Sequence, residues 1–267
     1  MQIFGRAGRP QFDKYGEATL ITNSDSTLQR YLNLVSLSVP IESNFMKQLP
    51  DHLNAEIVSG TVSNVNEAME WLKYTYLYIR MKKNHIAYGI SFSQIENDGG
   101  NLDNTVREMI INAGKLLDSH HMIRMDIDSG NMSVSGLGRV ASHFYIQAAS
   151  VEIFNELLEE QEQNNNDPDI DYSSNNNWSD SRLCHIICSA KEFENVRIRQ
   201  DESKEMEDIQ RNNKCCLFPI DDCTTIDEHA GKCSVLLQAY ISNNNAPPLK
   251  SFTLISDTNY IASNAGK

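Results

Sequence analysis

The chain has 267 residues, of which 40% are hydrophobic and 22% are charged, with 13 glycines and 7 prolines. This composition excludes collagen-like and wholly disordered proteins, and the length suggests two or three domains. The formal net charge is −13, but residues 1–50 carry 5 basic and 4 acidic side chains, 51–150 carry 8 and 11, and 151–267 carry 10 and 21. The acidity lies mainly in the last part, so it does not exclude nucleic acid as a partner of the first two.

No stretch approaches the roughly 18 to 20 consecutive apolar residues that a membrane helix needs. The start, Met1 to Arg6, lacks the basic and apolar regions of a secretory signal. We therefore expect the six cysteines to be reduced thiols, and the protein to reside in the nucleus and/or cytoplasm with no membrane as a partner.

The first elements along the chain are predicted to be a strand, a turn and a helix. Gly16–Thr22 is typical of a β-strand, and a helix-start cluster follows at Asn23–Ser26. Apolar residues then recur at helical spacing up to Val35. This segment is too short to be a domain alone.

From Leu49 the pattern changes to helices. Asn64 is expected to cap a helix that reaches Met81, with apolar residues on one face at Val65, Ala68, Met69, Leu72, Tyr76 and Ile79. A second helix is expected over Asp103–Asp118, with an inner face of Val106, Ile110, Ala113 and Leu117. Two apolar runs then flank Asp128–Asn131, which indicates a β-hairpin. Helices followed by a hairpin are typical of a winged helix.

The last third alternates between helical and polar stretches. Ser150–Leu158 is expected to be helical, as are Asp180–Glu194 and Lys232–Ile241. Between the first two, residues 159–180 are rich in asparagine and acids with few apolar side chains. Such a stretch buries too little surface to order itself, so it is predicted to be a solvated insertion.

The start of the chain carries the motif with the clearest chemistry. In Gln2–Pro10, Arg6 and Arg9 stand three residues apart among small residues. Arginine presents a planar, permanently charged fork that matches phosphate oxygens, and Gly5 and Gly8 allow a close backbone approach. The pattern indicates a phosphate clamp that neutralises charge on a phosphoryl group in transfer. On the pattern alone, a basic turn on the surface is the simpler interpretation.

These residues resemble a known family. Gln2-x-x-Gly5-Arg6-Ala7-Gly8-Arg9-Pro10 is similar to motif VI of the Ski-two-like branch of superfamily 2 nucleic-acid helicases. The resemblance continues through Pro40–Ser43, Leu53–Ile57, Tyr74–Met81, Tyr88–Ser91 and Leu137–Ile146. In the large two-cassette members of this branch, a winged helix and a Sec-sixty-three-type helical domain follow a pair of RecA-like domains.

The resemblance implies a mixed, mostly α fold in three parts. Residues 1–48 would be the C-terminal part of the second RecA-like α/β domain, and 49–135 the winged helix. Residues 136–267 would be the N-terminal part of the Sec-sixty-three-type helical domain, with the Asn-rich insertion at about 159–180.

The resemblance also implies roles for the motif. Arg6 and Arg9 would be catalytic and would reach the phosphates of ATP across the cleft between the RecA-like domains. Gln2, Gly5 and Gly8 would contact the nucleotide. ATP with Mg²⁺ would be bound mainly by a domain missing from this chain, because it contains no phosphate loop and no Asp-Glu-x-His-type metal box.

The chain therefore looks like a fragment of an ATP-dependent helicase, and alone it is expected to be inactive. Its partners would be RNA or DNA and other subunits of a multiprotein complex. Two groups within the branch share this layout: the helicase subunits of activating signal cointegrator complexes and the spliceosomal helicases that unwind small nuclear RNA duplexes. Details such as Met122–Arg124, Phe154–Leu157, Ala190–Phe193 and Ser251–Asp257 favour the cointegrator type. Tyr76–Tyr78 and Tyr88–Ser91 resemble the first of its two cassettes. A rival of another class is a non-enzymatic adaptor whose winged helix binds another protein.

Other candidate residues have simpler interpretations. The three cations within Arg80–Lys83 could touch a nucleic-acid backbone, but cations at a helix C-terminus also complement its dipole. His120–His121 is expected in a solvated turn, and His143 and Tyr145 are expected to pack at a domain interface.

A cysteine cluster near residue 220 invites a zinc interpretation. It consists of Cys215, Cys216, Cys223 and Cys233, with His229. None of these spacings is Cys-x-x-Cys, and the segment is acidic, so no metal is expected.

Overall fold

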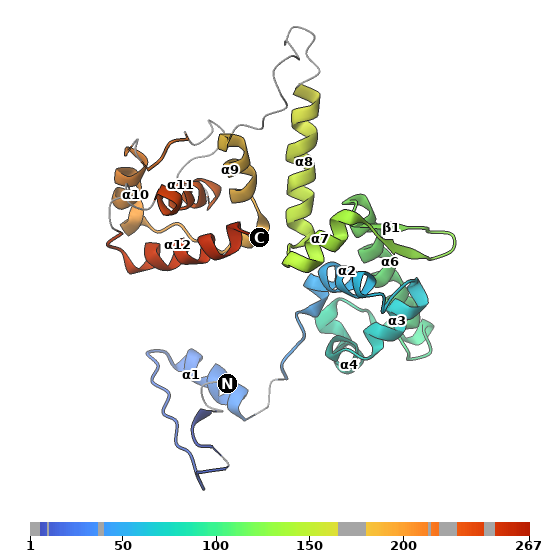
Figure 1. Ribbon diagram of the computed structural model, residues 1–267. Coiled ribbons are helices and arrows are strands. Elements are labelled where there is room, and N and C mark those ends of the chain that lie inside the picture. The colour runs from blue at the N-terminus through green and yellow to red at the C-terminus, as the bar shows by residue number, and fades with distance from the viewer. Residues whose placement is uncertain are drawn as a thin grey trace.

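The computed structural model describes residues 6–9, 11–36, 40–164, 180–212, 215–218, 229–242 and 249–267 (Figure 1). Helices dominate these residues and gather around two hydrophobic cores. We call residues 45–151, around the first core, the winged-helix lobe, and the described residues of 184–265, around the second core, the C-terminal lobe. The mostly α fold predicted from the sequence is confirmed.

The N-terminal segment, residues 6–9 and 11–36, lies apart from both lobes in Figure 1. It contains the predicted helix, α1 (Asp25–Val35), none of whose residues is buried. The strand predicted over Gly16–Thr22 is wrong, because these residues have no regular structure. A strand needs a neighbour to bond with its backbone groups, and among the described residues no strand pairs with this segment.

The winged-helix lobe begins with α2 (Leu49–Ser59), α3 (Val65–Lys73), α4 (Tyr76–Lys83), α5 (Phe92–Asn97) and α6 (Asp103–Ser119). Short 3-10 turns lie at Phe45–Gln48 and His85–Tyr88. The strands β1 (Ile123–Met125) and β2 (Met132–Val134) then form an antiparallel hairpin in which Met125 lies opposite Met132. Helix α7 (Gly136–Phe144) follows. The predicted hairpin is confirmed.

Helix α6 packs both inward and against the hairpin. The predicted inner-face residues are all buried, namely Val106, Ile110, Ala113 and Leu117. Gly114 faces the hairpin, where an added Cβ would lie 2.6 Å from Met125 Sδ. Because position 114 has no side chain, the Met125 side chain can fill this space and hold the hairpin against the helix.

The single helix predicted over Val65–Met81 divides into α3 and α4. Thr75 caps the second helix, since its Oγ1 accepts a hydrogen bond from the Tyr78 amide at 3.4 Å. The break reorients α4, so Tyr76 and Ile79 are exposed although the periodicity placed them on the inner face. The prediction of one continuous helix was therefore wrong at this point.

Helix α8 (Ala148–Asn164) connects the lobes, and the C-terminal lobe then contains α9 (Asp180–Cys188), α10 (Ser203–Gln210), α11 (His229–Ser242) and α12 (Phe252–Ala265). Short 3-10 turns lie at Lys191–Phe193 and Gln200–Glu202. Helix α11 is the central element, because every residue from Ala230 to Ala239 is buried. Helix α8 continues beyond Leu158, where the composition predicts an insertion, and residues 165–179 of that insertion lie outside the described residues.

A buried charge network fixes the C-terminal lobe. The Lys232 ammonium, on α11, donates to Glu202 Oε2 and Asp257 Oδ2, both at 2.7 Å, and to the Arg197 carbonyl at 2.8 Å. Arg199 Nη1 donates to the same two carboxylates, at 2.7 and 3.0 Å. Two cations and two anions therefore balance inside the lobe. Within the described part of the chain, no helix has the length and apolarity to cross a lipid bilayer.

Candidate functional site

The arginine motif forms a loop that closes on itself, and we call residues 6–9 and 11–16 the arginine loop. The Arg9 carbonyl accepts hydrogen bonds from the amides of Phe12 and Asp13, at 2.8 and 2.7 Å. The Asp13 carboxylate accepts a bond from the Arg9 amide at 3.0 Å. These local bonds shape the loop without help from either lobe.

Two glycines allow the loop to close. Gly8 has a positive φ of 83°, a backbone conformation that other residues rarely adopt. At Gly16, a Cβ atom would lie 2.0 Å from the Ala7 carbonyl oxygen, a distance that no structure tolerates. Glycine is thus required at both positions.

Three of the five predicted site residues lie together on the arginine loop: Arg6, Gly8 and Arg9. Both arginine residues are exposed, so their guanidinium groups are accessible to a phosphate presented from outside the chain. Gln2 and Gly5 lie outside the described residues. The catalytic and nucleotide-contacting roles of all five residues stay predictions.

Residues Ile41–Ser43 are bonded to the winged-helix lobe. We call these three residues and their partners, Tyr76, Arg80, Asn84 and Tyr88, the Glu42 joint. Glu42 Oε1 accepts bonds from Arg80 Nη2 at 2.8 Å and Asn84 Nδ2 at 2.7 Å. Its Oε2 accepts bonds from Arg80 Nε at 3.2 Å and the Tyr88 hydroxyl at 2.8 Å. Both carboxylate oxygens are therefore fully used.

The neighbours of Glu42 are also held. The Tyr76 hydroxyl donates to the Ile41 carbonyl at 2.8 Å, and the Ser43 amide donates to the Tyr88 hydroxyl at 2.8 Å. Three consecutive residues are thus bonded to both ends of α4 and to the turn that follows it.

The electrostatics of the joint favour its charged form. Hydrogen bonds from Arg80, Asn84 and Tyr88 lower the pKa of Glu42 from its ordinary 4.5 to about 2. The bond to Glu42 raises the pKa of Arg80, and burial raises the pKa of Tyr88. A bidentate pair of this kind is short and directional, so it sets orientation as well as distance.

Sequence reasoning missed the role of Glu42. Arg80 is 8% exposed and its guanidinium bonds this carboxylate, so of the three cations within Arg80–Lys83 it is not one that is exposed to a nucleic-acid backbone. Lys82 and Lys83 remain exposed, and Lys82 Nζ lies 4.8 Å from the centre of the Tyr78 ring. The available signal was that Glu42, Arg80 and Tyr88 all belong to the stretches that carry the family resemblance.

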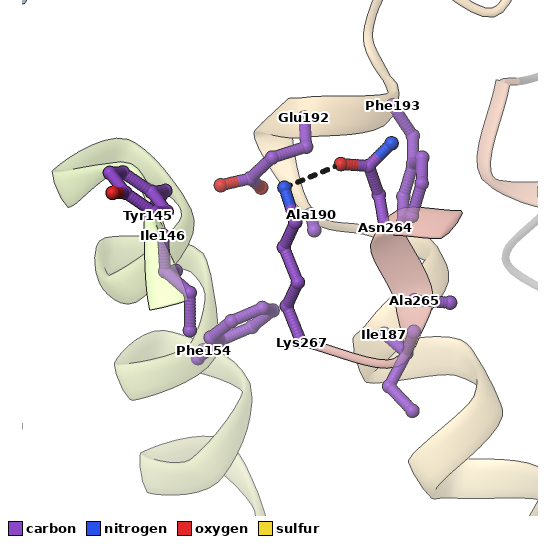
Figure 2. Close-up of a pocket in the computed structure, with 10 residues that line it drawn as sticks. All are labelled: Tyr145, Ile146, Phe154, Ile187, Ala190, Glu192, Phe193, Asn264, Ala265 and Lys267. Carbon is purple, nitrogen blue, oxygen red and sulfur yellow. Dashed lines mark hydrogen bonds between the residues drawn. The ribbon is translucent and has the colours of Figure 1, made fainter. Parts of the chain in front are cut away.

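A pocket of about 140 Å³ lies between the two lobes (Figure 2). Its apolar lining comes from both lobes and consists of Ile146, Phe154, Ile187, Ala190, Phe193 and Ala265. Glu192, Asn264 and Lys267 supply the polar groups, with Lys267 Nζ donating to Asn264 Oδ1 at 2.8 Å. Tyr145, also in the lining, is 82% exposed with a φ of 58°. The prediction that His143 and Tyr145 pack at an interface is therefore wrong, because both side chains are exposed.

The two adjacent histidines differ. His121 is exposed, as predicted for a solvated turn, whereas His120 is only 8% exposed. Helix α8 covers His120, with Glu152 Oε1 at 3.5 Å from its Nε2 and Asn155 Nδ2 donating to its carbonyl at 3.1 Å. The covering helix comes from about thirty residues later in the chain, so local sequence did not reveal it.

The cysteines gather in the core of the C-terminal lobe. Cys215 and Cys233 are buried there, while Cys223 lies outside the described residues. Among the residues that the structure describes, no group of three or more His, Cys, Asp or Glu side chains could hold a metal ion. A hydrogen bond from Cys188 lowers the pKa of Cys184 from 9.0 to about 7, although burial raises it.

Comparisons with known proteins match the two lobes separately. A family model described as a Winged Helix-turn-helix domain matches residues 42–117. A second, described as a Sec63 Brl domain, matches residues 169–267. Both agree with the helical elements described above.

Curated relatives match along the whole chain. It is 45% identical over 267 residues to activating signal cointegrator 1 complex subunit 3 of Dictyostelium discoideum, and 43% identical over 267 residues to a DExH-box ATP-dependent RNA helicase of Arabidopsis thaliana. The predicted resemblance is confirmed. Human activating signal cointegrator 1 complex subunit 3 is 40% identical over 271 residues. Each of these alignments covers 100% of this chain but 11% of the relative, so the chain spans about a tenth of their length.

Proposed function

We propose that the chain is part of an ATP-dependent nucleic-acid helicase. The observation that carries the proposal is similarity along the whole chain, at 43% identity, to a relative named as an ATP-dependent RNA helicase. The exposed arginine loop supports it, because two guanidinium groups on a self-supporting turn suit a phosphate held by another domain. Residues 1–48 would end a RecA-like domain, 49–135 would be the winged helix, and 136–267 would begin the helical domain.

In this role Arg6 and Arg9 neutralise charge that develops on the γ-phosphate of ATP in the transition state. ATP and Mg²⁺ would be held mainly by residues beyond this chain. Gly8 and Gly16 allow the tight loop that presents the arginines.

The winged helix acts as a brace in this proposal, not as a reader of bases. The turn of its hairpin carries Asp126 and Asp128, which repel a phosphate backbone. A hydrogen bond from Ser129 lowers the pKa of Asp126, so this carboxylate stays charged. Other subunits of a cointegrator-type complex, and an RNA or DNA strand, would bind elsewhere on the full-length protein.

The test is nucleic-acid-stimulated ATP hydrolysis by the full-length protein that contains this chain. Arg9→Ala should lower kcat by roughly 10³ or more with little change in nucleotide affinity, because the lost contact acts mainly in the transition state. Lys14→Ala is a matched control, since Lys14 is another exposed cation of the same loop. An unchanged kcat for Arg9→Ala would remove the arginine loop from the reaction, and a full-length protein without ATPase activity would favour an adaptor.

A further inference from the structure

The Glu42 joint links the N-terminal segment, which carries the arginine loop, to the winged-helix lobe. No residue of α1 is buried. By contrast, the carbonyl of Ile41, the carboxylate of Glu42 and the amide of Ser43 are all bonded to the winged-helix lobe. Among the described residues up to Ser43, these three hold the hydrogen bonds to the winged-helix lobe, so a displacement of the arginine loop that travels along the chain arrives at them.

The receiving end of the joint is rigid. Leu77 and Met81 of α4 have no exposed surface and anchor the helix in the first core. Arg80 lies between them in sequence and projects its guanidinium to Glu42. A displacement of Glu42 is thus passed to a helix that is held by its packed core residues, because such packing transmits strain.

The geometry of the contact is directional. The Arg80 fork bonds both carboxylate oxygens, and Asn84 and Tyr88 bond one oxygen each. A charge-assisted fork constrains rotation as well as separation, whereas a single hydrogen bond leaves rotation free.

We propose that Glu42 is a positioning residue that couples the nucleotide-driven movement of the arginine loop to the winged helix, and through it to the strand-separating parts of the protein. The proposal rests on the proposed function. It assigns Glu42 no contact with ATP or nucleic acid.

The experiment compares ATP hydrolysis with duplex unwinding in the full-length protein. Glu42→Gln keeps the size of the side chain but removes its charge and faces an amide toward three donors. We expect kcat for ATP to stay within about twofold while base pairs unwound per ATP fall at least tenfold. Arg80→Lys keeps the positive charge but loses the two-pronged guanidinium contact. Its number of base pairs unwound per ATP should lie between those of the wild type and Glu42→Gln.

Two further variants separate coupling from general destabilisation. Tyr88→Phe removes one hydroxyl from the joint and should lower unwinding per ATP with little change in thermal midpoint. Lys73→Met breaks the contacts of Lys73 with Glu70 and Asp103 in the same lobe, at 2.9 and 3.1 Å, without touching the joint. It should leave both activities unchanged.

Equal losses of ATPase and unwinding in Glu42→Gln and Tyr88→Phe would overturn the coupling role, and so would wild-type unwinding per ATP in both. A failure of the proposed function would give a different result. In that case Arg9→Ala would not lower the ATPase activity of the full-length protein.

Discussion

Asp51 and Glu192, which belong to different lobes, accept hydrogen bonds from adjacent amides at the start of α8. Ala148 N lies 2.6 Å from Asp51 Oδ1, and Gln147 N lies 2.8 Å from Glu192 Oε1. The Ser150 hydroxyl also donates to Glu192. The free amides and positive dipole end of a helix favour carboxylates, so one helix end fastens both lobes.

We expect Glu192→Ala to loosen the C-terminal lobe from α8. Loss of a side chain that bonds the first-turn amides costs about 0.5 to 2 kcal/mol. Hydrogen exchange should speed up at Gln147 in the variant, and the thermal midpoint should fall. Glu194→Ala is the control, since Glu194 pairs with Lys191 on the surface. Equal effects of the two substitutions would mean that Glu192 acts only as a surface charge.

The Glu42 joint should make stability depend on pH in acid. The pKa of Glu42 is lowered to about 2 in the folded chain from an ordinary value of 4.5. Its contribution is therefore fully present above about pH 4.5 and is lost as the pH falls through about 2. Urea unfolding of the wild type and Glu42→Gln from pH 6 to pH 2 should show a stability difference that shrinks across this window. A difference that is constant with pH would contradict the charge-based account.

Replacing Lys232 should be far more costly than replacing a surface lysine. Lys232→Met leaves the Glu202 carboxylate, 2% exposed, without its main counter-charge. Burial alone would raise the pKa of Glu202, but hydrogen bonds from Lys232, Thr253 and Arg199 outweigh it and lower the pKa. Breaking a buried pair costs about 3 to 5 kcal/mol, whereas an exposed pair contributes about 0 to 1. Urea unfolding should show a much larger loss of stability for Lys232→Met than for Lys191→Met. Similar unfolding midpoints for the two variants would contradict a stabilising role of the buried network.

Cys184 should be alkylated faster than the other described thiols near neutral pH. Its pKa is lowered to about 7, whereas burial raises the pKa of Cys216 to about 12, and the thiolate is the nucleophile. In a Cys223→Ser background, iodoacetamide followed by peptide mass spectrometry should locate the first label at Cys184. The rate should rise through about pH 7 and disappear in Cys184→Ser. First labelling at Cys216 would contradict the assignment.

The spacing of apolar residues predicted the helices whose buried face follows from the helix repeat alone. The inner face of α6 follows from spacing alone, because a helix that covers a core must bury every third or fourth residue. The break at Thr75 was missed because the apolar spacing continues across it. A threonine within such a pattern fits a helix interior as well as a helix cap, so the residue type does not show which one is formed. The strand at Gly16–Thr22 was predicted from composition, which does not show whether a partner strand exists.

The arginine loop was predictable as a motif, but the Glu42 joint was not. Glu42 meets residues 38 to 46 positions later in the chain, and no local pattern encodes such a pairing. His120 was misjudged for the same reason, since its cover comes from α8. Contacts between distant segments are the part of a site that a single sequence leaves open.

The sulfur-rich contact between the hairpin and α6 makes the winged helix vulnerable to oxidants. Met125 already fills the room left by Gly114, and Met132 Sδ lies 3.6 Å from the point that a Cβ at position 114 would occupy. Oxidation to the sulfoxide adds a polar oxygen to an apolar side chain, and on Met125 that oxygen would stand at the contact with α6. We therefore expect oxidation of Met125 to weaken the packing of the hairpin against α6.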